Sequence, residues 1–469
     1  MTPSSDKRWR ALTLSLLGVT WSFCALRPVC AYAAGESASL PGRVRPGVEE
    51  YRVTGLIVSG LQRTNRAWIE SYMGLSFPAR MNDLDAQRLA RKLLTTEVFS
   101  DVRVAFEPSP GHPDERLLHV AIEEKWTTIP VVRGTYGGGT PLRVVGAYET
   151  HAFGRLMTLG GEMRKYGDAP PGYVLYARDP RSHGDRYYLG AEVWRDFHRR
   201  QVYSRGDGRV LGAISTNKTM TRLRLLTPWN AHKASQIGEE YPWKYGVELE
   251  GAQEAPSIFD AAPGESAAPP KDLVLGTGHK RSGQFLPTLL FDNVDVDNIE
   301  LDGLRAKLHG GLLIETQGLH PVADLEVFGY KLLPHDLNLA AHLFVGGTTY
   351  NALSTSYFLG GFDSIRGLPD GAIFGTHAAY ANLELRHVAL KTKYLWVQTT
   401  TFADGGCAGA TWADAATNDR ASAGIGARFA VPQVYRLVVR VDYAWEIGAH
   451  AAHGLTVGMN QFFDPYKPL

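Results

Sequence analysis

The residues best suited to a defined chemical task lie in one glycine-rich loop in the C-terminal part of the sequence. The segment GGFDSIRGLPDG begins with Gly360 and Gly361 and places Arg366 between Ile365 and Gly367. An arginine stays charged at physiological pH and forms several directed hydrogen bonds to carboxylates. An arginine between small and apolar residues of such a loop is unusual, which makes Arg366 a candidate functional residue.

No enzyme motif accompanies this loop. The 15 histidines are scattered along the chain, and no G-x-S-x-G element of a serine hydrolase is present. We therefore expect no enzymatic activity, no metal and no cofactor. The net charge of +1 provides no overall field that would favour nucleic acid as a partner.

The N-terminus has the features of a secretory signal peptide. A basic end is followed by the apolar stretch Ala11 to Leu26, and Ala31 to Ala33 forms an A-x-A cleavage site. The sequence thus predicts a signal peptide over residues 1–33 and a linker over 34–50. Only Cys407 would remain in the mature chain, which excludes an intramolecular disulfide and a cysteine-based metal site.

The segment 51–125 has the pattern of a small α+β domain in the order β-α-α-β-β. Thr64 is expected to cap the first helix, and Asn82 or Asp83 the second. Leucines 84, 89, 93 and 94 are expected on the buried side of the second helix. An exposed sheet edge in such a domain can accept an extended peptide as an additional strand.

The segment 126–469 alternates apolar with polar or small residues, as the strands of a membrane β-barrel do. In Tyr435 to Trp445, for example, one face is apolar and the other carries Arg436, Arg440 and Asp442. The length predicts about sixteen strands. Residues 196–207 and 251–271 are expected to be extracellular loops. A soluble β-sandwich also alternates, but export and the charges on the second face favour the barrel. The predicted fold is therefore mostly β, with one small domain before a 16-stranded transmembrane barrel.

With this organisation, the Ile365-Arg366-Gly367 loop resembles the motif of the BamA/TamA superfamily of outer-membrane barrels, and the small domain resembles a POTRA domain. Leu368 departs from the motif, where an aromatic residue is usual. The resemblance implies that the loop folds back into the lumen. It also implies that Arg366 meets two inner-wall carboxylates, which match Glu384 and Asp404 here.

The C-terminus resembles this family less closely. Phe462 and Phe463 match the aromatic signal that ends the last strand of such barrels, but Asp464 to Leu469 extend beyond them with two prolines. The resemblance implies a weakly closed seam between the first and last strands, which this tail could cover.

The resemblance implies an outer-membrane factor that inserts or secretes polypeptides, with the Arg366 loop as a lumenal lock. Its partners would be outer-membrane lipids, a polypeptide substrate at the periplasmic POTRA-like domain, and accessory lipoproteins, and the barrel would be monomeric. The alternatives are a diffusion porin, an orphan structural barrel, and an outer-membrane lipid-modifying enzyme. The last would need a nucleophile with an adjacent base, and no such motif is present.

Overall fold

The computed structural model describes residues 50–136, 141–182, 186–204, 208–229, 242–269, 278–297, 299–316, 318–350, 353–361, 363–448, 452–459 and 462. The predicted signal peptide, almost all of the predicted linker, Phe463 and the C-terminal tail lie outside the described residues.

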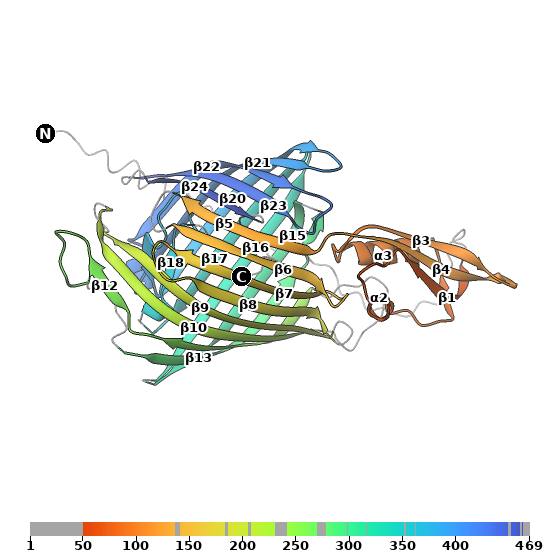
Figure 1. Cartoon of the computed structure of the whole chain (residues 1–469), viewed down its shortest axis with the longest axis horizontal. Helices are drawn as coiled ribbons and strands as arrows, with labels where there is room; N and C mark the ends of the chain where they lie inside the picture. Colours follow the sequence, from red (N-terminus) through yellow and green to blue (C-terminus); the bar gives the residue numbers. More distant parts are fainter. Residues whose placement is uncertain are drawn as a thin grey trace. The chain divides into compact units, whose positions relative to one another are not determined.

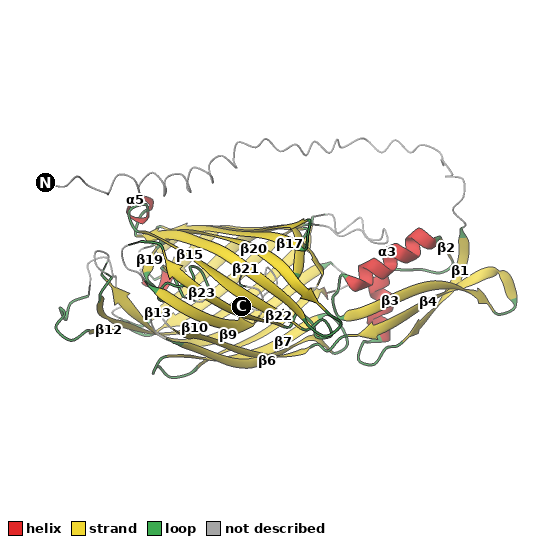
Figure 2. Cartoon of the chain, turned by 90° about the horizontal axis from the view of Figure 1, so that it is seen from above, coloured by secondary structure: helices red, strands yellow, loops and turns green. Residues whose placement is uncertain are grey.

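The first part of the described chain is a four-stranded sheet packed against two helices, shown in red in Figure 2. The elements are β1 (Tyr51–Ser59), α2 (Arg66–Met73), β2 (Ala79–Met81), α3 (Asp83–Leu94), β3 (Phe99–Ser109) and β4 (His112–Glu124). The strand order is β2-β1-β4-β3, with β1 and β4 parallel and the other pairs antiparallel. The short strand β2 is an addition to the expected order. The order also leaves β3 at one edge of the sheet.

The helix ends differ in detail from the sequence-based expectation. Asn65, not Thr64, caps α2, because its side-chain oxygen accepts hydrogen bonds from the backbone N–H groups of Ala67 and Trp68. In α3 the prediction of Asn82 as the cap is confirmed, since it forms a reciprocal capping box with Asp85. The buried face of α3 consists of Ala86, Leu89 and Leu93, whereas the expected Leu84 and Leu94 are exposed.

The rest of the described chain forms a closed antiparallel barrel of sixteen strands (Figure 1), which confirms the predicted fold class. The strands are β5 (Thr128–Tyr136), β6 (Leu142–Ala152), β7 (Met157–Tyr166), β8 (Gly172–Arg181), β9 (Tyr187–Tyr203), β10 (Val210–Pro228), β11 (Trp243–Glu254), β13 (Lys280–Asp292), β15 (Glu300–Glu315), β16 (Gly318–Leu333), β17 (Leu337–Thr348), β20 (His377–Lys391), β21 (Trp396–Gly409), β22 (Asp419–Ala430), β23 (Val438–Glu446) and β24 (His453–Met459). Two short segments, β12 (Ile258–Ala261) and β14 (Asp295–Asp297), continue the pairing of β11 with β10 and of β13 with β15. An even number of strands places both ends of the barrel at the same rim.

The outer wall of the barrel is apolar along nearly every strand. Exposed large apolar side chains include Val132, Val145, Met163, Leu175, Val193, Leu223, Leu249, Phe285, Leu308, Leu319, Leu343, Leu383, Ile425, Val439 and Val457. A band of this extent is far larger than the apolar patches of soluble monomers and matches the lipid-facing surface of a membrane barrel. No helix in the described ranges is long and apolar enough to cross a membrane.

The inner wall is polar, as the alternation predicts, but it is more tightly packed than a watery lumen. On β22 and β23, Arg428, Arg440 and Asp442 have no exposed surface. They lie in a network of ion pairs instead of bulk water. The cost of burying these charges must therefore be offset by their mutual pairing.

Three expectations about the strands were wrong. Strand β23 begins at Val438, not Tyr435, so that Arg436 lies in the preceding turn. Residues 196–203 and 258–261 are strands, not loops. By alternation Met459 shares a face with the exposed Leu455 and Val457, yet it is buried, and its sulfur accepts a hydrogen bond from the backbone N–H of Val132.

The barrel closes where β24 meets β5. Among the described residues this pairing joins three residue pairs, Leu455–Tyr136, Thr456–Thr135 and Val457–Gly134. The neighbouring pair β23–β24 joins seven. Within the described ranges the seam therefore has fewer backbone pairs than the adjoining interface.

Candidate functional site

The loop between β17 and β20 carries Arg366 into the barrel. It contains the 3₁₀ turn η2 (Leu353–Thr355) and a small hairpin of β18 (Tyr357–Leu359) and β19 (Ile373–Gly375). Ile365 and Leu368 are buried with residues of this hairpin and of the barrel wall. Leucine at position 368, where the family motif has an aromatic residue, thus fills an apolar site.

Three glycines of the loop occur where the backbone adopts conformations that favour glycine. Gly360, Gly361 and Gly367 have φ values of +117°, +70° and +82°, which other residues rarely adopt. A Cβ atom on Gly367 would also lie 2.9 Å from the Cβ atom of Ala444 on β23. The chain therefore turns sharply on both sides of Arg366 and passes close to the inner wall.

Arg366 is fully buried and meets both carboxylates that the family resemblance assigns to it. Asp404 on β21 accepts hydrogen bonds from the backbone N–H of Arg366 at 3.0 Å, from Nε at 2.8 Å and from Nη2 at 2.8 Å. Glu384 on β20 accepts a hydrogen bond from Nη1 at 2.5 Å. The predicted residues Ile365, Arg366, Gly367, Glu384 and Asp404 are thus brought together at one place.

Four further charged residues complete what we call the lumenal cluster. Arg386 pairs with Glu384 at 2.7 Å, Arg428 pairs with Asp442 at 2.5 Å, and Arg440 pairs with Asp442 at 3.3 Å. The cluster thus consists of Arg366, Arg386, Arg428, Arg440, Glu384, Asp404 and Asp442, all of them almost or completely buried. The four arginines lie close together, so their like charges repel one another and the carboxylates must offset that repulsion.

The sequence contained a signal for part of this larger cluster. Arg428, Arg440 and Asp442 fall on the inner face by alternation, but alternation does not show which strands lie next to the loop. Only the closed barrel brings β20, β21, β22 and β23 around Arg366. Alternation also predicts that Arg386 points inward, because it lies two residues after Glu384 on β20 and therefore on the same face.

Two aromatic rings also contact the guanidinium group. The ring centre of Phe402 on β21 lies 3.4 Å from the Cζ atom of Arg366, and that of Phe462 lies 3.9 Å from it. The interpretation of Phe462 as the end of the last strand is wrong. Strand β24 ends at Met459, and Phe462 is buried with inner residues of β15, β16 and β17.

A second group of contacts joins the small domain to one rim of the barrel. Arg436, in the turn between β22 and β23, forms two ion-paired hydrogen bonds with Glu97, one of them at 2.6 Å. Arg63 pairs with Glu149 at 2.7 Å, and the hydroxyl of Thr64 lies 3.0 Å from Nε2 of His151. We call these contacts the joint.

The backbone is strained at the joint. Glu97 and Arg436 both have positive φ values, two of five non-glycine residues of this kind in the described chain. Such strain persists only where the surrounding structure holds it in place. The geometry therefore indicates a specific attachment, which sequence patterns could not reveal.

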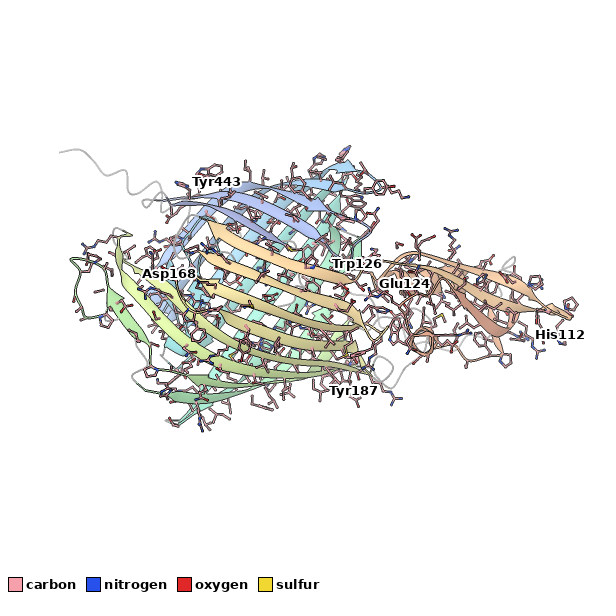
Figure 3. All side chains as sticks on the ribbon, in the orientation of Figure 1. His112, Glu124, Trp126, Asp168, Tyr187 and Tyr443 are labelled. Carbon is pink, nitrogen blue, oxygen red and sulfur yellow. The ribbon has the colours of Figure 1, made fainter. Side chains whose placement is uncertain are left out.

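Glu124, labelled in Figure 3, lies at the end of β4 and binds the loop before α2. Its carboxylate accepts hydrogen bonds from the backbone N–H groups of Gln62, Arg63 and Thr64 at 3.0–3.1 Å. Burial raises the pKa of Glu124, but these hydrogen bonds and one from the Thr64 side chain outweigh it and hold the pKa below its ordinary value.

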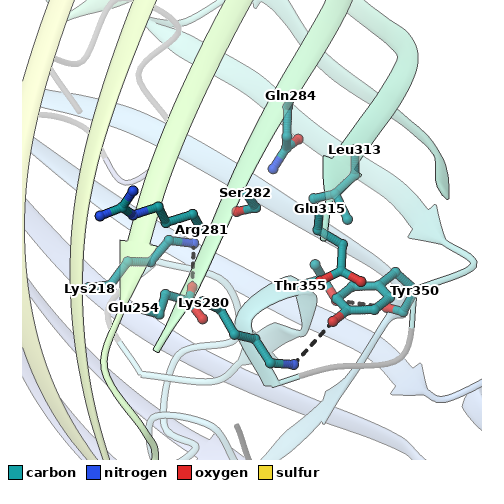
Figure 4. Close-up of a pocket in the computed structure, with 10 residues that line it drawn as sticks. All are labelled: Lys218, Glu254, Lys280, Arg281, Ser282, Gln284, Leu313, Glu315, Tyr350 and Thr355. Atoms are coloured by element: carbon teal, nitrogen blue, oxygen red, sulfur yellow. Dashed lines mark hydrogen bonds and ion pairs between the residues drawn. The ribbon is translucent and has the colours of Figure 1, made fainter. Parts of the chain in front are cut away.

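A polar cleft lies on the inner wall away from the lumenal cluster (Figure 4). Lys218 pairs with Glu254 at 3.1 Å, and Nζ of Lys280 donates to the hydroxyl of Tyr350 at 3.1 Å. Within the described part of the chain, no group of three or more His, Cys, Asp or Glu side chains is arranged to hold a metal ion.

Comparisons with known proteins identify the architecture. No family model matches the sequence, and no curated protein matches it. Among solved structures, BamA from Haemophilus ducreyi lacking POTRA domains 1–3 is 16% identical with a TM-score of 0.53, covering 88% of this chain and 85% of that chain. CdiB from Acinetobacter baumannii is 13% identical with a TM-score of 0.58, covering 87% of this chain and 74% of that one. CdiB from Escherichia coli is 11% identical with a TM-score of 0.55, covering 87% and 76%.

The chain therefore has the fold of the BamA and CdiB barrels. The resemblance that the Arg366 loop indicated is confirmed at the level of the fold.

Proposed function

We propose that this protein is an outer-membrane barrel that inserts or translocates polypeptides, with the Arg366 loop as a lumenal lock. The observation that carries the proposal is the burial of Arg366 between Asp404 and Glu384 inside the barrel. Its fold, shared with BamA and CdiB, and its apolar outer wall support an outer-membrane location.

The buried loop favours this function over a diffusion porin. A porin needs an open aqueous channel, whereas here Ile365, Arg366 and Leu368 pack against the inner wall with almost no exposed surface. Removing the loop from this position would separate a buried ion pair, which costs about 3–5 kcal/mol when one partner is lost. A barrel with this lock is closed until something displaces the loop.

The small domain gives such a barrel a place to receive a polypeptide, which we assign to the periplasmic side. Strand β3 (Phe99–Ser109) is at the edge of its sheet and pairs with β4 on one side only among the described residues. An extended polypeptide can add to such an edge through backbone hydrogen bonds, which suits substrates of varied sequence.

The enzymatic alternative would need a nucleophile held next to a base. One serine of the small domain is placed in this way: Ser59 Oγ lies 2.8 Å from Nε2 of His119, and Nδ1 of His119 lies 2.5 Å from Oε1 of Glu107. These three side chains belong to the neighbouring strands β1, β4 and β3, outside the barrel and the lumenal cluster. Within the barrel, His309 pairs with the carboxylates of Glu248 and Asp324. We therefore propose no catalytic role and no cofactor.

The test is Arg366→Ala in cells that produce the full chain, with Arg281→Ala as a matched control at an exposed arginine of β13. Heat-modifiable gel mobility reports whether the barrel folds, and the outer-membrane protein profile reports function. Arg366→Lys serves as a second variant that keeps the charge but loses the paired hydrogen bonds, in case alanine prevents folding.

We expect a folded Arg366 variant with a depleted subset of outer-membrane or surface proteins, and an unchanged profile for Arg281→Ala. An unchanged profile with folded Arg366→Ala and Arg366→Lys barrels would refute the lock and favour a structural barrel or a porin.

A further inference from the structure

We infer that Phe462 is a positioning residue for Arg366, so that a side chain from beyond β24 completes the lumenal cluster from within the barrel. The inference rests on the proposed lock and adds a component to it. It arises from the unexpected position of Phe462, which lies three residues after the end of β24 and is only 4% exposed.

The contact geometry supports an electrostatic role for the ring. The ring centre of Phe462 lies 3.9 Å from the Cζ atom of Arg366 and 4.8 Å from that of Arg440. The face of an aromatic ring is electronegative, and its attraction for a cation grows when water is excluded. A single ring thus serves two arginines of the same cluster.

The charge balance of the cluster gives a reason for this ring. Four buried arginines lie within one cluster of ion pairs, and their like charges repel one another. An aromatic face can offset part of that repulsion without adding another charge that would itself need a partner. Phe402 contributes in the same way from β21.

The position of Phe462 in the chain also links two parts of the barrel. Strand β24 forms the seam with β5 through three residue pairs among the described residues, and Phe462 follows β24 closely. A change that displaces the end of β24 must therefore alter the contact with Arg366. Conversely, a loop that leaves the lumen removes a cation that holds Phe462 inside.

Simple apolar packing is the competing explanation. Phe462 also lies in a cluster with Leu301, Phe328, Tyr330 and Ala340. Leucine would satisfy much of this packing but offers no aromatic face, whereas tryptophan retains the face. The pair Phe462→Leu and Phe462→Trp therefore separates the two explanations. Phe429→Leu is the matched control, because Phe429 lies on the outer face of β22.

The experiment uses the purified full chain in two measurements. Conductance in planar lipid bilayers reports the ratio of open to closed time, and the midpoint temperature of the heat-induced mobility shift reports stability. Arg366→Met and the Phe462→Leu/Arg366→Met double variant complete a double-mutant cycle.

For Phe462→Leu we expect a lower midpoint and a rise of about tenfold in the open-to-closed ratio, the effect of losing a contact of about 1.4 kcal/mol. Phe462→Trp and Phe429→Leu should behave like the unmodified chain. In the cycle, the loss at Phe462 should largely disappear once Arg366 is methionine.

The outcomes separate the inference from the lock. If Phe462→Leu and Phe462→Trp have equal midpoints and conductance, Phe462 is a packing residue and the inference is wrong. The effects of the two substitutions on the midpoint can be non-additive while Arg366→Met leaves conductance unchanged. In that case Phe462 positions Arg366, and the proposed lock is wrong. If Arg366→Met does not fold, the contrast between leucine and tryptophan still decides the role of Phe462.

Discussion

Asp404→Asn is the most informative single change for the lumenal cluster, because it removes one charge while nearly preserving shape. Asp404 accepts three hydrogen bonds from Arg366, two through Oδ2 and one through Oδ1. Asparagine can keep a neutral oxygen at one position. Its NH₂ group at the other would face a donor of the guanidinium group.

The size of the effect follows from these contacts. Hydrogen bonds to a charged acceptor contribute about 1.5–3 kcal/mol each, against about 0.5–1.5 kcal/mol for neutral ones. Two weakened bonds, each losing about 1–1.5 kcal/mol, and one lost bond of about 1.5–3 kcal/mol amount to about 3.5–6 kcal/mol. This overlaps the range of about 3–5 kcal/mol for breaking a buried ion pair. The change also removes one negative charge from among the four arginines of the cluster.

The assay is the midpoint temperature of the heat-induced mobility shift, measured for Asp404→Asn and for Asp419→Asn. Asp419 is exposed at the start of β22 and provides the same chemical substitution outside the cluster. We expect Asp404→Asn to lower the midpoint by several degrees and Asp419→Asn to leave it unchanged. Equal midpoints for the two variants would refute the claim that Asp404 holds the loop.

Three further predictions concern the joint and the loop. Arg436→Met should leave the barrel folded but make the small domain more sensitive to limited proteolysis, because Glu97 loses its paired hydrogen bonds. Gly367→Ala should lower the midpoint of the mobility shift, since the added Cβ atom would collide with Ala444 at a φ of +82°. Because the pKa of Glu124 lies below its ordinary value of 4.5, its ionised carboxylate stabilises the loop that brings Arg63 and Thr64 to the joint at pH values above 4.5. This stabilisation should be lost as the pH falls through the lower pKa of the folded state.

Each of these predictions has a matched control. Arg103→Met removes an ion pair at the surface of the small domain, where the arginine is 78% exposed, and should not change proteolysis. Gly251→Ala adds a Cβ atom with no neighbour within 4 Å and should be neutral. Glu124→Gln should show at neutral pH the proteolytic sensitivity that the unmodified chain acquires only in acid. Equal sensitivity of this variant and the unmodified chain at neutral pH would contradict the role of Glu124.

Local patterns predicted those parts of the fold that depend on local physics. Alternation placed Arg440 and Asp442 on the inner face because successive side chains of a strand point to opposite faces. The cap at Asn82 was predictable because a helix cap depends only on residues within one helical turn.

The parts that failed depend on contacts across long sequence distances. Tyr435 and Arg436 continue the alternating pattern of β23, yet they belong to the turn because the small domain, more than three hundred residues earlier in the chain, holds them there. Phe462 likewise follows a strand pattern but lies inside the barrel against Arg366. No periodicity contains that information.

The turn that holds Glu97 also has a mechanical consequence. It connects β22 with β23, and these two strands carry Arg428, Arg440 and Asp442. Part of a tensile load on the small domain would thus be transmitted through the Glu97–Arg436 pair to the strands that surround the loop. A polypeptide that pulls on the small domain would therefore also exert a force on the ion-paired strands inside the barrel.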